Sequence, residues 1–146
     1  MIAKSLREAA THTTAVRKLL LRKSEDLVCR NLMCERVGEA CVCKLSLVLE
    51  RLPELTHLDV SGNKLGALPP AVAALRNLTE LDVSGNRLKS LPSLAQLTAL
   101  ETLRVEDNPD LASVPADAPA LRRVFAKGTA PTFTLPSSMT TVQLDK

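Results

Sequence analysis

Aromatic side chains are almost missing from this sequence. Its 146 residues include two phenylalanines, Phe125 and Phe133, and neither tryptophan nor tyrosine. No apolar run approaches the roughly 18 residues that a membrane-spanning helix needs, so no such helix is predicted. Apolar residues still make up 45% of the chain and charged residues 24%, a balance that argues against wholesale disorder. Leucine occurs 27 times and must therefore build most of the core.

An excess of charge of one sign is also missing over most of the chain. Residues 1–23 hold six basic side chains and one acidic, whereas the other 123 residues hold 13 basic and 15 acidic. A nearly neutral body lacks the field of a nucleic-acid-binding protein, so such binding would have to come from the basic N-terminus. No secretory signal is visible, because the longest apolar run near the start is Leu19 to Leu21. We expect an intracellular, cytoplasmic protein, with a mitochondrial location as the alternative, since the start also fits a transit peptide.

The four cysteines lie close together but lack the spacing of a zinc site. They follow the pattern C-x4-C-x6-C-x-C, at Cys29, Cys34, Cys41 and Cys43. Zinc modules usually present two C-x2-4-C pairs, and no histidine lies nearby to replace a thiol. We expect no metal, and thiols that stay reduced inside a cell.

A leucine string repeats along the middle of the chain. The pattern L-x2-L-x-V-x2-N-x-L-x2-L-P starts at Leu55 and starts again 23 residues later at Leu78. A third copy follows at Leu100, and a weaker fourth starts at Leu121 with Thr129 in the place of the asparagine. Self-similarity at such a period is the signature of a stacked repeat architecture.

Weaker matches extend the pattern on both sides. The opening part of the string recurs near the C-terminus at Met139, Val142 and Leu144. Counting back 31 residues from the first clear copy gives a further match at Leu27, Cys29, Cys34 and Val37, with Leu32 in the asparagine place. In that alignment Cys29 and Cys34 are predicted to be buried thiols that act as small hydrophobic side chains.

These copies resemble the leucine-rich repeat family over about residues 25–145. The resemblance implies an α/β solenoid in which about five short strands form a curved parallel sheet. The residues agree with it, because Leu58 and Val60 alternate with Asp59 and so share one face of a strand. One such strand cannot bury its apolar side alone, but stacked copies bury it against one another. The turn asparagines are expected to be buried and to bond backbone groups, at Asn63, Asn86 and Asn108.

The segments that return from one strand to the next differ in length. After the first repeat, apolar side chains spaced by three or four residues predict a helix that faces the core, at Val42, Leu45, Leu49 and Leu52. The later returns contain proline at 68–70, 91–93 and 114–119. Proline favours extended chain or a single 3₁₀ turn there.

Separate predictions concern the two ends of the chain. Apolar side chains recur every three or four residues at the start, at Ile2, Leu6, Ala9, Thr13, Val16 and Leu20. They predict a basic amphipathic helix over 1–24 that precedes the repeat domain at 25–146. It could cap the stack, or engage a partner or an import receptor; without an aromatic anchor, we expect no membrane binding. At the other end, an open strand around 142–144 offers backbone groups to a protein partner.

Signatures of known chemistry are absent. The sequence holds no nucleotide-binding loop, dinucleotide fingerprint, hydrolase elbow or zinc-protease motif. His57 lies close to Asp59 and, one repeat along, to Glu80, so an enzyme with His57 as general base is an alternative. No motif fixes a nucleophile beside it. We expect no catalytic activity, no cofactor and no small-molecule substrate.

The inner, concave face of the sheet is the predicted binding surface. The candidate interface residues point outward from successive strands, at Arg30, His57, Asp59, Glu80, Asp82, Arg104, Glu106, Arg123, Phe125 and Lys127. Acidic residues dominate its middle and basic residues its end, where Phe125 stands as an apolar anchor of the kind enriched in binding hot spots. We therefore expect a protein-protein interaction or scaffold module, an accessory subunit or adaptor in a larger assembly. The alternative is an accessory subunit of a mitochondrial ribosome or respiratory complex.

Overall fold

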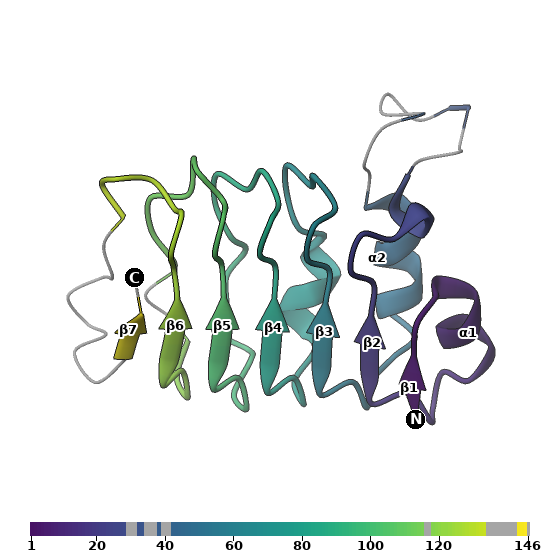
Figure 1. The fold of residues 1–146 in the computed structure, drawn as a ribbon. Coiled ribbons are helices and arrows are strands. Elements are labelled where there is room, and N and C mark those ends of the chain that lie inside the picture. The colour runs from purple at the N-terminus through teal and green to yellow at the C-terminus, as the bar shows by residue number, and fades with distance from the viewer. Residues whose placement is uncertain (29–31, 34–37, 39–41, 116–117, 134–142, 146) are drawn as a thin grey trace.

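The fold is an open, parallel sheet that grows one strand at a time in chain order. The structure is a computed structural model that describes residues 1–28, 32–33, 38, 42–115, 118–133 and 143–145. Within these residues the sheet has seven strands, β1 (Ile2–Ala3), β2 (Lys18–Leu20), β3 (His57–Asp59), β4 (Glu80–Asp82), β5 (Thr102–Arg104), β6 (Arg123–Phe125) and β7 (Gln143–Asp145). Each strand pairs in parallel with the next, so the chain forms a solenoid (Figure 1). The predicted fold class is confirmed, with more strands than the five expected.

One residue of each strand from β1 to β6 points into the core. The pairing aligns these residues across the sheet, as Ala3, Leu19, Leu58, Leu81, Leu103 and Val124. All six are at most 2% exposed. Burial of one such aliphatic side chain contributes about 1.5–3 kcal/mol, and it requires the neighbouring strand to be in place.

The turn asparagines form a buried ladder, as predicted. The Asn63 side chain donates to the carbonyls of Leu21 and Val60, both at 2.7 Å, and its oxygen accepts from the Ser24 N–H at 2.8 Å. One repeat along, Asn86 donates to the carbonyls of Val60 and Val83. Each asparagine therefore satisfies backbone groups of its own turn and of the preceding one.

The ladder continues at Asn108 and weakens after it. Asn108 is fully buried, donates to the carbonyls of Val83 and Val105, and accepts from the Leu88 N–H. Thr129 takes the asparagine place in the next repeat, where its hydroxyl donates to the Ala126 carbonyl at 2.7 Å. A hydroxyl has one proton to donate whereas an amide has two, so it cannot reproduce both of the amide's donor contacts.

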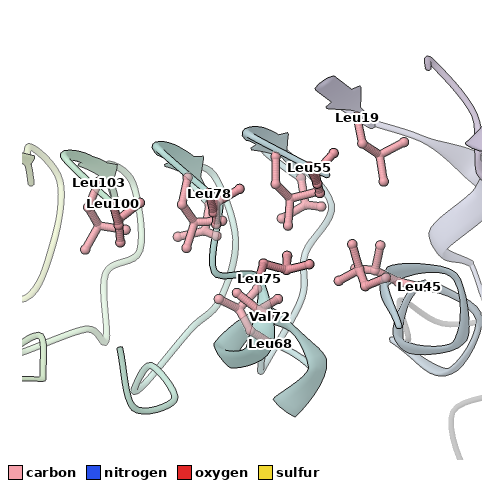
Figure 2. Packing of buried hydrophobic residues seen from close by; sticks show 14 of the residues in the cluster. Leu19, Leu45, Leu55, Leu68, Val72, Leu75, Leu78, Leu100 and Leu103 are labelled. Carbon is pink, nitrogen blue, oxygen red and sulfur yellow. The ribbon is translucent and has the colours of Figure 1, made fainter. Parts of the chain in front are cut away.

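The long return after β2 contains the predicted helix. Helix α2 (Cys43–Leu49) buries its apolar stripe, Leu45, Val48 and Leu49, with Leu52 just beyond it. The next return is the 3₁₀ helix η2 (Pro70–Ala74), which starts at a proline and buries Val72. Figure 2 shows Leu45 and Val72 below the strands, facing Leu55 and Leu78. These returns close the core on the side opposite the open face of the sheet.

The N-terminal segment departs from the prediction of one helix over 1–24. It forms β1, a short helix α1 (Leu6–Thr11), β2 and a 3₁₀ helix η1 (Glu25–Leu27). The physical reason is that Val16, Leu19 and Leu21 have strand spacing, V-x2-L-x-L, which matches the opening of the repeat string. Pairing with β3 gives these residues a sheet partner that an isolated helix would not have. Ile2, expected on the apolar helix face, is 49% exposed.

Helix α1 sits at the β1 end of the sheet and is fixed by two caps. Ser5 precedes it, and its hydroxyl accepts from the Glu8 N–H at 3.1 Å. The Leu6 N–H donates to the Asp26 carboxylate at 2.9 Å, which ties α1 to η1. Leu6 and Ala9 are fully buried, so α1 covers the core at this end (Figure 1).

The predicted alignment of the first repeat, which included Leu27, is therefore wrong. β3 pairs with residues 18–20, which lie 39 residues before it, and not with the segment that starts at Leu27. Leu27 belongs to η1, and Leu32 is 87% exposed. The other positions of that alignment, Cys29, Cys34 and Val37, lie outside the described residues, as do Met139 and Val142 at the C-terminal end.

The helices are short. The longest described α-helix, α2, has seven residues. None of the helices in the described part of the chain is long and apolar enough to cross a membrane.

Candidate functional site

Side chains on the side of the sheet away from the core form rows that run from strand to strand. We call this surface the open sheet face. Its first row comprises Lys18, His57, Glu80, Thr102 and Arg123. The second row comprises Leu20, Asp59, Asp82, Arg104 and Phe125. Backbone hydrogen bonds continue the register into a third row, Arg22, Ser61, Ser84, Glu106 and Lys127.

The rows bring together nine of the ten predicted interface residues. They extend over β3 to β6 and the residues just after β5 and β6, at His57, Asp59, Glu80, Asp82, Arg104, Glu106, Arg123, Phe125 and Lys127. Arg30 lies outside the described residues. The placement on one face follows the predicted alternation; a binding role for these residues remains a prediction.

The sequence analysis missed the β2 part of this face. Lys18, Leu20 and Arg22 occupy the first positions of the three rows. They were assigned to the predicted N-terminal helix, where they would have been solvent-facing or core residues. The spacing of Val16, Leu19 and Leu21 was the signal that could have identified this strand.

Asp59 and Asp82 serve the backbone of their own turns. A carboxylate oxygen of Asp59 accepts from the Ser61 N–H at 2.9 Å, and Asp82 accepts from the Ser84 N–H at 3.0 Å. Aspartate commonly bonds a backbone N–H two residues on. The two aspartates therefore have a structural role that accounts for their repetition.

Ion pairs cross the strands in the middle of the face. His57 Nε2 lies 3.6 Å from Glu80 Oε2, and Glu80 Oε1 lies 3.5 Å from Arg104 Nε. Arg104 Nη1 also lies 3.6 Å from Glu106 Oε1. Each of these side chains is about one third exposed, so each pair contributes at most about 1 kcal/mol. They place the Arg104 guanidinium between Glu80 and Glu106.

Phe125 is flanked by two guanidinium groups. Arg104 Cζ lies 4.1 Å from the centre of the Phe125 ring, and Arg123 Cζ lies 4.8 Å from it. Both distances fall within the range of cation-π attraction. The ring is only half-buried, so this cluster presents an apolar edge and positive charge to solvent.

The geometry around His57 is that of a polar contact on the surface. His57 Nδ1 lies 2.9 Å from the Thr56 hydroxyl, and Nε2 faces Glu80. With about a third of both side chains exposed, water reaches the pair. A general base needs a reacting group held within hydrogen-bond reach. His57 instead lies between an alcohol and a carboxylate on an open surface.

A groove lies at the end of strands β2 to β4, beside the open sheet face. It has a volume of about 610 Å³ and is lined by both backbone and charged groups, including Lys23, Glu25, Lys64 and Arg87. Lys23 and Lys64 have positive φ values of 49° and 58°, where the chain turns away from the sheet. This groove was not predicted, because its basic residues come from turns that the repeat string leaves variable.

The residues that the structure describes include no cluster suited to binding a metal ion. Groups of three or more histidine, cysteine, aspartate or glutamate side chains suited to an ion are absent from that part of the chain. Cys43, at the start of α2, is exposed. Cys29, Cys34 and Cys41 lie outside the described residues.

Comparisons with known proteins agree with the repeat geometry. The model of the leucine rich repeat family matches residues 51–109. A solved leucine-rich repeat protein of Leptospira interrogans superposes with a TM-score of 0.65 at 23% identity, covering 99% of this chain. The chain spans 40% of the length of that protein. No curated protein matches.

The asparagine ladder, the in-register leucine rows and the matched family model thus lead to one conclusion. The chain has the fold of a leucine-rich repeat protein, and its residues 51–109 match the leucine rich repeat family.

Proposed function

We propose that this chain is a non-catalytic interaction module that holds a protein partner against its open sheet face. Leucine-rich repeat proteins generally mediate protein-protein contacts, and solenoids use the extended surface formed by their strands. The supporting observation is the cluster of Arg104, Phe125 and Arg123. An aromatic ring beside arginines, on a rigid sheet, has the composition of a binding hot spot.

The proposal includes a role as an adaptor or accessory subunit in a larger assembly. The strands that carry the face are held by the buried leucine rows and by the asparagine ladder. Side chains on such a rigid scaffold are ordered before binding, which lowers the entropic cost of association. A rigid face of this kind suits the holding of a partner.

Site-specific cross-linking tests the proposed face. A photo-reactive amino acid replaces His57, Arg104 or Phe125, one at a time, in the chain expressed in its own cells. Leu47, which is 66% exposed on α2, is the matched control position away from the sheet face. We expect one and the same protein to be cross-linked from the three sheet positions and not from position 47. Cross-links from position 47 alone would contradict the proposal.

The C-terminal edge is a second proposed contact. β7 pairs with β6 on one side, and among the described residues no strand pairs with its other side. Unpaired backbone groups at such an edge can accept a strand from another chain. We expect fast amide exchange over Gln143–Asp145 in the isolated chain and protection on addition of the cross-linked partner. Equal protection with and without that partner would contradict this contact.

We also propose a cytoplasmic location. Residues 1–23 provide six buried core side chains, at Ala3, Leu6, Ala9, Val16, Leu19 and Leu21. Cleavage of this segment as a mitochondrial leader would remove two strands and expose the core, which supports the interpretation of the segment as a cap. Imaging of the full chain with a C-terminal fluorescent tag tests the location, and mitochondrial fluorescence would contradict it.

A further inference from the structure

The β1 and β2 end of the open sheet face combines basic and aliphatic side chains. Lys18 and Arg22 face outward from β2 and its extension, with Leu20 between them. Ile2 on β1 aligns with Lys18, and Lys4 directly follows β1. We call these five residues the basic patch. It lies at the opposite end of the sheet from β6 and β7 (Figure 1).

Aliphatic side chains of the basic patch reach solvent. Ile2 is 49% exposed and Leu20 is half-buried, whereas Ala3 and Leu19, which alternate with them, are fully buried. Met1, next to Ile2, is 42% exposed. The core is therefore filled from the other side of β1 and β2, and these aliphatic groups remain for contact with a ligand.

The basic side chains of the patch are not used by the fold. Lys4, Lys18 and Arg22 are exposed, and within the described part of the chain none of them forms an ion pair. Arg104, further along the same face, lies instead between two glutamates. The three charges of the basic patch are therefore available to a ligand.

Carboxylates near residues 1–23 leave a positive balance. Six basic side chains and Glu8 lie within the segment. The carboxylates that contact or align with it from elsewhere are Asp26, Glu54 and Asp59. Six basic against four acidic side chains leave a net charge of +2. Of the four, Asp59 alone lies in a row of the open sheet face, and its carboxylate accepts from the Ser61 N–H at 2.9 Å.

The expectation of no membrane binding applied to a helix that does not form. A helix over 1–24 without an aromatic anchor has little to hold it at a membrane surface. In the structure, β1 and β2 instead place Lys18, Leu20 and Arg22 on one face of a sheet. The chemistry of this end must therefore be judged from the strands.

Exposed aliphatic side chains among unpaired basic ones are suited to the surface of an anionic membrane. Aliphatic groups enter the boundary between headgroups and acyl chains, while lysine and arginine remain at the anionic headgroups. Each basic side chain held there strengthens binding about 5-fold, so three of them together strengthen it about 100-fold. Lys18 and Arg22 lie about 13 Å apart along the extended chain, so they reach different headgroups.

We infer that the basic patch binds the surface of a membrane rich in anionic lipid, with Ile2 in the headgroup boundary and Lys4, Lys18 and Arg22 at the headgroups. This inference goes beyond the proposed function and does not depend on it, because β3 to β6 stay free for a protein partner. The cytoplasmic leaflet is the anionic one, in agreement with the location proposed above.

A membrane fits the basic patch better than other anionic partners. The bases of a single-stranded nucleic acid stack on aromatic side chains, and the patch contains none. An acidic peptide is held best where a groove encloses it, and none of the five patch residues lines the groove at the turns. An open strand surface with protruding aliphatic groups matches a plane.

Vesicle sedimentation tests the inference. The purified full chain is mixed with vesicles of phosphatidylcholine alone, or of phosphatidylcholine and phosphatidylserine in equal parts. We expect binding to the phosphatidylserine vesicles that falls as salt is added, and binding to the neutral vesicles that is at least about 10-fold weaker. Equal binding to both vesicles would overturn the inference. Displacement from the vesicles by an oligonucleotide or a glutamate-rich peptide, at equal negative charge, would also overturn it.

Two double variants with the same change in net charge locate the site. Lys18→Glu with Arg22→Glu should weaken binding to the phosphatidylserine vesicles about 10-fold or more. Arg123→Glu with Lys127→Glu, at the far end of the same face, should weaken it less than about 3-fold. All four side chains are exposed, so both proteins should fold, and thermal melting checks this. Equal losses in the two variants would overturn the inference.

A pair of uncharged variants tests the aliphatic contact. Ile2→Ser should weaken vesicle binding about 3-fold or more without changing its salt dependence. Leu47→Ser is the matched control, because Leu47 is 66% exposed on α2, and it should change binding less than about 2-fold. Equal effects of the two variants would overturn the inference. These measurements contain no protein partner, so their failure leaves the proposed function to the cross-linking experiment.

Discussion

Asn86 joins two repeats, because its side-chain oxygen accepts from the Asn63 N–H at 3.1 Å while its amide donates to the carbonyls of Val60 and Val83. It also accepts from the Leu65 N–H at 3.1 Å. The side chain thus replaces water for several backbone groups that the turn leaves without sheet partners. This contact explains why asparagine recurs in the string while the residue after it varies, as Lys64, Arg87 and Pro109.

Removal of this amide should be costly. Asn86→Ala leaves at least two buried backbone groups without partners, at about 1–3 kcal/mol each, so we expect a loss of about 3–5 kcal/mol in the free energy of unfolding. Urea denaturation measures it. Asn77 is the control, because it is exposed and its side chain donates to the Pro53 carbonyl at the surface, so Asn77→Ala should cost less than about 1 kcal/mol. Similar losses for the two variants would contradict the ladder.

The N-terminal strand should be part of the same cooperative unit as the repeats. Leu19 is fully buried in β2, and its neighbour Leu20 lies on the open sheet face and is half-buried. We expect Leu19→Ala to lower the free energy of unfolding by about 2–5 kcal/mol, and Leu20→Ala to lower it by about 1 kcal/mol or less. Denaturant unfolding compares the two. A greater effect at position 20 would mean that residues 18–20 do not form the strand described.

Glycine is required where two successive turns touch. Gly85 has a φ of +66°, and a Cβ there would lie 3.2 Å from the backbone of Gly62. Gly38 also has a positive φ, of +83°, but among the described residues no atom lies within 4 Å of a Cβ there. Because both substitutions carry the backbone strain and only one carries the contact, Gly85→Ala should be more destabilising than Gly38→Ala, by about 1 kcal/mol or more. Equal melting temperatures for the two variants would show that the turns can separate without cost.

The surface ion pairs should matter little for stability. Glu80 bridges His57 and Arg104, but all three side chains are about one third exposed. We expect Glu80→Gln to change the free energy of unfolding by less than about 1 kcal/mol in urea denaturation. Asn108→Ala, which removes buried hydrogen bonds, provides the contrast. A loss at Glu80 as large as the loss at Asn108 would indicate that the pairs hold the strands together.

The repeat string was sufficient to predict much of the fold. The period-two alternation at Leu58 and Leu81 fixed which face is buried, and the fixed place of the asparagines indicated a buried turn. The helix at Cys43–Leu49 and the 3₁₀ turn after Pro69 were also predicted, from apolar spacing and from proline. Each of these signals is local in the sequence, so it can be recognised without knowledge of the neighbouring strand.

The N-terminal strands could not be predicted from the same signals. Val16, Leu19 and Leu21 fit the repeat string, but spacings of three residues also fit a helix. Ser24 stands in the asparagine place of this repeat, and it bonds Asn63 through its backbone N–H, which leaves no side-chain signature. The return that contains α2 lengthens the spacing between β2 and β3 to 39 residues. Counting back by a shorter interval therefore gave a false match at Leu27.

The candidate site, like the fold, could be predicted only in part. Alternation along each strand placed Arg104, Arg123 and Phe125 on one face. Their contacts depend on the register between β5 and β6, which sets Arg104 beside Phe125. The copies that start at Leu100 and Leu121 already align Arg104 with Phe125, but the repeat spacing does not give the side-chain conformations that make these contacts.

The most direct test of the account is a map of chemical shifts on the isotope-labelled chain as the partner identified by cross-linking is added. Amide shifts should cluster at Arg104, Arg123 and Phe125, with small changes at Lys18 and Arg22. Shifts centred on the groove, at Lys23, Lys64 and Arg87, would contradict the claim that the open sheet face is the binding surface.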